Sequence, residues 1–116
     1  MMRFLLLCAA ASSLAFAQDG DAKKGKELFL KYTCYGCHGF SGQNGPGARL
    51  VPMKMAQSAF FGYVRNPPRA NIMPSYSAKV APDSDLADIY AYIKTLPDSN
   101  APAKSIPVLN SIINEK

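Results

Sequence analysis

The most informative segment of this 116-residue chain is Cys34-Tyr35-Gly36-Cys37-His38, around which the rest of the fold is expected to form. Its two thiols stand three positions apart, and an imidazole directly follows the second, which is the pattern of covalent c-type haem attachment. Each thiol can add to one vinyl group of a haem, and the adjacent imidazole can then coordinate the iron as the proximal ligand. The sequence therefore predicts one covalent haem c, attached through both cysteines, with His38 on the iron.

A pair of cysteines at this spacing also occurs in zinc sites and in redox dithiols. A structural zinc site takes about four Cys, His or carboxylate ligands, whereas the chain has a single histidine and one further cysteine, Cys8. A thioredoxin-like dithiol is expected near a strand–helix–strand pattern, which the sequence does not show. Haem attachment is therefore the preferred interpretation, and free titratable thiols at the motif would indicate a thiol oxidoreductase instead.

The first 17 residues have the features of a secretory signal peptide. Arg3 supplies the positive charge, residues 4–16 are apolar or small, and Ala15-Phe16-Ala17 is a small-x-small cleavage site. The apolar run is shorter than the ~20 residues that span a bilayer, and an uncleaved anchor is the alternative. Cleavage after Ala17 predicts a periplasmic protein whose haem domain covers residues 18–116. No later apolar run is long enough to insert stably in a membrane.

The predicted mature chain is one small basic domain. Cleavage leaves 116 − 17 = 99 residues, and both remaining cysteines lie in the haem motif, so no disulfide is available. Removal of Arg3 leaves 12 Lys/Arg against 8 Asp/Glu, a charge of +4. This charge suits docking on an acidic patch of a redox partner, and solubility is the alternative reason for it. Nucleic-acid binding is not expected of an exported chain with this motif.

The segment before the motif is predicted to be a helix over residues 22 to about 32. Asp19 and Asp21 stand at its start, at positions suited to an N-cap and a first-turn acid. Leu28 and Phe29 lie on one stripe with Gly25, at spacings of three and four residues. Because a glycine inside a helix costs roughly 1 kcal/mol relative to alanine, we expect another helix to approach closely at Gly25.

Two further helices are expected after a glycine-rich loop over residues 39–52. One covers residues 56–65 and is stopped by the prolines that follow. The other covers residues 85 to about 96, with Asp83 or Ser84 as its cap. A carbonyl of the glycine-rich loop is expected to accept a hydrogen bond from the His38 ring.

A sixth iron ligand is expected from a methionine, since His38 is the only histidine. A thioether suits a high-potential electron carrier, and the mature candidates are Met53, Met55 and Met73. Pro74 restricts Met73 to an extended backbone, and a helix separates Met73 from the haem motif. We therefore predict Met73 as the distal ligand and assign Met53 and Met55 to packing.

Two interpretations stay open for Arg65, and two for the apolar residues near the C-terminus. Arg65 is either a partner of a haem propionate or an exposed charge at a helix C-terminus. Leu109, Ile112 and Ile113 are expected to form a short helical turn packed against the body of the domain, and a partner-docking surface is the alternative.

Together these residues resemble the class I c-type cytochromes. The resemblance extends over nearly the whole mature chain: Gly25-Lys26-Glu27-Leu28-Phe29 and the haem motif, Val64-Arg65-Asn66-Pro67, Met73-Pro74, and Ile89-Tyr90-Ala91-Tyr92-Ile93. It implies that Gly25 and Phe29 cross Ile89 and Tyr92 of the last helix. In this family a proline carbonyl often receives the proximal histidine N–H. Here either Pro46 or the region near Ala48 is expected to do so.

The predicted fold is all-α and cytochrome c-like, with three to four helices around one covalent haem. The predicted function is single-electron transfer between a dehydrogenase or respiratory complex and an acceptor, by a protein that is not itself an enzyme, as a free shuttle or as a subunit of an oxidoreductase complex. Cys34 and Cys37 hold the porphyrin, and His38 and Met73 hold the iron. The alternative is a haem enzyme or gas sensor with an open distal site, for peroxidase-like chemistry or diatomic-ligand binding.

Overall fold

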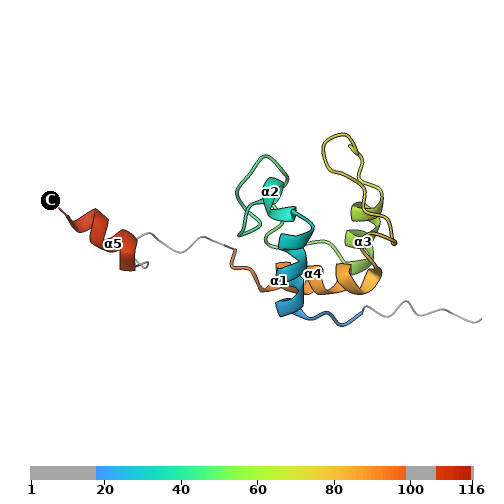
Figure 1. The fold of residues 1–116 in the computed structure, drawn as a ribbon, viewed down its shortest axis with the longest axis horizontal. Coiled ribbons are helices and arrows are strands. Elements are labelled where there is room, and N and C mark those ends of the chain that lie inside the picture. Colours follow the sequence, from blue (N-terminus) through green and yellow to red (C-terminus); the bar gives the residue numbers. More distant parts are fainter. Residues whose placement is uncertain (1–17, 99–106, 116) are drawn as a thin grey trace, which may run out of the picture.

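A computed structural model of the chain describes residues 18–98 and 107–115. The predicted signal peptide lies outside these residues. Within them the regular elements are all helices (Figure 1). They are α1 (Ala22–Lys31), α2 (Cys34–His38), α3 (Gln57–Arg65), α4 (Asp83–Thr95) and α5 (Pro107–Asn114). The all-α prediction is confirmed, and none of the described helices has the length and apolar character needed to cross a membrane.

The crossing of α1 and α4 is the main packing contact of the domain (Figure 1). At Gly25 the two backbones approach so closely that an added Cβ atom would lie 1.9 Å from the Asp88 carbonyl oxygen. The rings of Phe29 and Tyr92 meet edge to face, with centroids 5.5 Å apart. Phe29 and Ile89 are both buried. The close approach expected at Gly25, and the pairing implied by the resemblance, are both present.

The apolar core extends from this crossing to α3. Phe29, Leu86 and Ile93 are the largest fully buried side chains. Phe60 on α3 packs its ring against that of Tyr90 on α4, with centroids 5.4 Å apart. The core thus joins α1, α3 and α4 and includes Val51 and Ala81 from the loops, whereas α2 has no buried residue.

The observed helix starts differ in part from the predicted ones. Of Asp19 and Asp21, Asp21 is the N-cap of α1, and its carboxylate accepts hydrogen bonds from the N–H groups of Lys23 and Lys24 at 2.9 and 3.2 Å. The prediction that Asp83 or Ser84 caps α4 is wrong. The N-cap is Pro82, without a side-chain hydrogen bond, because Asp83 is already helical and its carboxylate binds Arg65.

The C-terminal segment forms α5, which is longer than the single turn expected. The prediction that it packs against the body is wrong. Val108, Leu109, Ile112 and Ile113 are all exposed, and no contact joins α5 to the other described helices. These apolar side chains therefore contribute nothing to the described core.

Candidate haem site

The haem motif forms the short helix α2 directly after α1. Thr33 separates the two helices in the left-handed conformation, with φ of 58°, and Gly39 ends α2 with φ of 75°. Cys34 is partly buried and Cys37 is exposed. Burial raises the pKa of the Cys34 thiol to about 11, so before haem attachment this thiol is protonated at neutral pH.

The His38 ring is oriented by the glycine-rich loop. Its Nδ1 atom lies 2.6 Å from the Ala48 carbonyl oxygen, which fits the tautomer in which Nδ1–H donates and Nε2 is free to bind a metal. The Gly47 N–H donates to the Cys37 carbonyl oxygen at 2.7 Å and holds the loop against α2. Of the two positions left open by the sequence, Ala48 supplies the carbonyl and Pro46 does not.

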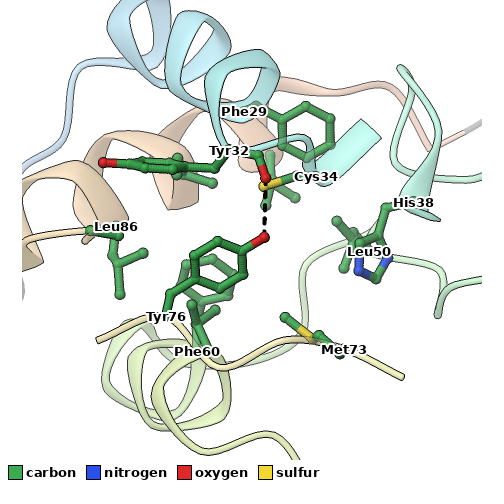
Figure 2. Close-up of a pocket in the computed structure, with 13 residues that line it drawn as sticks. Phe29, Tyr32, Cys34, His38, Leu50, Phe60, Met73, Tyr76 and Leu86 are labelled. Carbon is green, nitrogen blue, oxygen red and sulfur yellow. Dashed lines mark hydrogen bonds between the residues drawn. The ribbon is translucent and has the colours of Figure 1, made fainter. Parts of the chain in front are cut away.

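A cleft of about 900 Å³ opens beside α2. Cys34, Cys37, His38 and Met73 all line it. Its inner end is a smaller apolar space shown in Figure 2, lined by core side chains such as Phe29, Leu86 and Ile93. His38 from α2 and Met73 from the loop after α3 extend into this space from two different parts of the chain (Figure 2). The four predicted site residues therefore share one cleft.

The three candidate methionines occupy different parts of this cleft. Met53 and Met73 are both half-buried and pack against the core cluster, but of the three methionines only Met73 lines the apolar inner end as well as the cleft. Met53 and Met55 line the outer part alone, and Met55 is exposed. Among the three thioethers, that of Met73 is thus the one surrounded by the same apolar side chains as the His38 ring.

Arg65 has a role that neither sequence interpretation anticipated. Its side chain is not an exposed helix-end charge, because only 18% of it is exposed. The guanidinium instead binds backbone carbonyls of the loop between α3 and α4, and the Asp83 carboxylate. The pattern of the sequence gives no signal for this, since the partners lie 11 to 18 residues away.

Two tyrosines beside the cleft were also missed as site residues. The Tyr76 hydroxyl donates to the Tyr32 carbonyl oxygen at 3.0 Å (Figure 2). The Tyr32 hydroxyl lies 2.7 Å from Asp85 Oδ2 and 2.9 Å from the Val80 carbonyl oxygen. The hydrogen bond to Asp85, together with burial and the negative charge of Asp85, raises the pKa of Tyr32 to about 12. These bonds connect the end of α1 with the loop that carries Met73.

The residues of the cleft fit a covalently attached haem. The volume of the cleft lies within the range of roughly 300–1,000 Å³ that is typical of ligand pockets in proteins. The inner wall is apolar, two thiols stand at haem-attachment spacing, and an imidazole and a thioether provide nitrogen and sulfur donors. A bound haem c supplies an iron that accepts and releases one electron, and the helical shell sets its environment.

A helical shell with a CxxCH helix at one wall of an apolar cleft defines a c-type cytochrome domain. The family model described as cytochrome c oxidase, cbb3-type, subunit III matches residues 20–93, and the chain belongs to this family. No curated protein and no solved structure matched the chain. The resemblance to class I c-type cytochromes is thereby confirmed, as is covalent haem c as the cofactor. The chain is an electron-transfer haem protein that exchanges electrons with redox partner proteins.

Proposed function

We propose that this chain is a periplasmic single-electron carrier whose haem iron is held by His38 and Met73. The observation that carries the proposal is that both side chains line one cleft, together with the two cysteines of the motif. The hydrogen bond that His38 Nδ1–H donates to the Ala48 carbonyl oxygen leaves Nε2 of His38 available for iron. A histidine–methionine pair raises the reduction potential of haem iron, which suits a high-potential electron carrier.

Replacement of Met73 by alanine tests the ligation. We expect the holoprotein to lose the ferric sulfur-to-iron charge-transfer band and its midpoint potential to fall, because a soft thioether stabilises ferrous iron. Met53→Ala and Met55→Ala are matched controls, since both side chains line the same cleft, and each should keep the band. An unchanged spectrum and potential in Met73→Ala would show that Met73 is not a ligand, and loss of the band in a control would identify the ligand instead.

An open distal site would make the chain a haem enzyme or a gas sensor. Mixing the reduced wild-type protein with carbon monoxide separates the two functions. Slow or weak binding is expected, because carbon monoxide must first displace the thioether. Rapid and tight binding would favour the open site and contradict the carrier proposal.

The periplasmic location rests on the signal-like residues 1–17. We expect the protein recovered from a periplasmic extract to begin at Gln18 and to carry the additional mass of one haem, both measurable by intact-protein mass spectrometry. A chain that retains residues 1–17 and fractionates with membranes would instead show an uncleaved anchor.

An acidic partner surface is proposed from the charges at the cleft. Lys54 and Arg69 line it, together with Arg49, whose guanidinium is paired with Asp98, and no carboxylate is among the described residues that line it. A dehydrogenase or an oxidase with an acidic patch would meet a positive potential here.

Small redox reagents of opposite charge test the sign of this potential. Electron transfer with anionic ferricyanide should slow as salt is added, and transfer with a cationic cobalt complex should accelerate, because salt screens both interactions. The opposite pair of trends would contradict an acidic partner.

A further inference from the structure

We propose that Arg65 is the positioning residue that holds the Met73 loop against the iron, an inference that rests on the proposed ligation by Met73. Arg65 is the last residue of α3. Its Nη1 donates to the carbonyl oxygens of Tyr76 at 2.9 Å and Ala81 at 2.6 Å. Its Nη2 lies 2.6 Å from Asp83 Oδ1, at the first residue of α4. One side chain thus joins the end of α3, two points of the loop and the start of α4.

Tyr76 takes part in three hydrogen bonds, one of which comes from Arg65. Besides the bond from Arg65 to its carbonyl, its N–H donates to the Val64 carbonyl oxygen at 3.1 Å. Its hydroxyl reaches the Tyr32 carbonyl oxygen, two residues before Cys34. The backbone of Tyr76 is therefore fixed on both sides, and its side chain connects the loop to the helix that precedes the haem motif.

This anchor shortens the free part of the loop around Met73. Between Arg65 and Tyr76 the chain forms a closed segment, and Met73 lies three residues before the anchor. Without Arg65, Tyr76 would keep only its N–H bond to Val64 and its hydroxyl bond to Tyr32, and the loop would lose its attachment to α3 at Ala81. A less constrained loop lowers the effective concentration of the sulfur at the iron. Arg65 therefore increases the fraction of molecules in which the thioether is bound.

The planar guanidinium is the feature that allows this role. It presents several donors in a fixed arrangement and binds two carbonyls and a carboxylate at once, with charge-assisted hydrogen bonds. A lysine ammonium at the same position keeps the charge but is a single compact donor group. Arg65→Lys should therefore keep part of the anchoring of the Met73 loop, and Arg65→Gln should keep little of it.

Imidazole binding to the ferric holoprotein tests the inference. Imidazole must replace the thioether, so its apparent affinity rises with the fraction of molecules in which Met73 is off the iron. We expect Arg65→Gln to bind imidazole about tenfold more tightly than wild type, the effect of losing at least one charge-assisted hydrogen bond. The imidazole affinity of Arg65→Lys should lie between those of wild type and Arg65→Gln. Lys79→Gln is the matched control: Lys79 is an exposed cation of the same loop without a side-chain bond in the described structure, and its removal should leave the affinity unchanged.

The outcomes separate this inference from the proposed function. If Met73→Ala binds imidazole more tightly while Arg65→Gln and Arg65→Lys match wild type, Met73 is a ligand and the role of Arg65 is wrong. If Met73→Ala changes neither spectrum nor affinity, the ligation itself is wrong. Lower stability to denaturant in the Arg65 variants, with unchanged imidazole affinity, would reduce Arg65 to a structural residue and overturn the inference. Should Arg65→Gln fail to fold, Arg65→Lys carries the test, with a smaller but measurable increase expected.

Discussion

The backbone N–H of Asp21 donates to Oδ1 of Asp88 at 2.7 Å and joins the start of α1 to the middle of α4. Asp88 is buried, with 8% of its surface exposed. Its second oxygen lies 3.6 Å from the Lys24 ammonium, whose side chain is 56% exposed. A charge-assisted hydrogen bond to a buried carboxylate contributes more to stability than an ion pair to a solvated lysine. The α1–α4 crossing therefore depends on Asp88 more as an acceptor than as a charge.

Replacement of Asp88 by alanine should lower the free energy of unfolding by about 2–3 kcal/mol, because the Asp21 N–H loses its acceptor at a packed helix crossing. Lys24→Gln, which removes only the ion pair, should cost less than about 1 kcal/mol. Urea denaturation of both holoproteins measures the difference. Equal losses in the two variants would show that the ion pair accounts for the stabilisation.

Replacement of Gly25 by alanine should destabilise the domain by about 3 kcal/mol, the upper range for overpacking. The added Cβ atom would lie 1.9 Å from the Asp88 carbonyl oxygen, a backbone atom that cannot move away without displacing α4. Gly62→Ala on α3 is the matched control, because nothing lies within 4 Å of its Cβ position. The free energy of unfolding of this control should rise by about 0.5–1 kcal/mol, because alanine has a higher helix propensity than glycine. A lower free energy of unfolding in Gly62→Ala would contradict the reasoning for both positions.

Replacement of Gly47 by alanine should raise the midpoint potential of the haem. Its Cβ atom would lie 2.9 Å from Nδ1 and Cε1 of the His38 ring, and 2.8 Å from the Cys37 carbonyl oxygen. The ring must then shift away from the Ala48 carbonyl, and a weaker hydrogen bond makes the imidazole a poorer donor to ferric iron. Redox titration measures the shift. Gly36→Ala, with open space at its Cβ position, should leave the potential unchanged, and a similar shift in both variants would exclude the hydrogen bond as its cause.

The stability contributed by the Tyr32 hydroxyl should disappear in alkali. Its pKa is raised in the folded state to about 12, against about 10 in the unfolded chain. The contribution is therefore complete below pH about 10 and is lost as the pH rises to about 12. Tyr32→Phe should lower the free energy of unfolding by about 1–2 kcal/mol at pH 8, and by clearly less at pH 11. Tyr63→Phe, at an exposed ring, is the control, and a pH-independent difference for Tyr32→Phe would contradict the assignment.

Features that depend on neighbouring residues could be predicted from the amino-acid sequence. The spacing of two cysteines and a histidine specified haem attachment, because the chemistry needs these groups within five consecutive positions. Apolar periodicity gave three helices whose observed ends differ from the predicted ones by at most two residues. Gly25 was identified as a close approach because a glycine inside a helix has a local cost that needs a compensating contact.

Contacts between groups that are far apart along the chain became known from the folded structure alone. The carbonyl that orients His38 is that of Ala48, and Arg65 binds the carbonyls of Tyr76 and Ala81. Every residue has the same backbone carbonyl, so no residue type marks the one that will accept a hydrogen bond. The path of the folded backbone selects it. The exposure of α5 was missed for the related reason that an apolar stripe specifies a face to be covered but not what covers it.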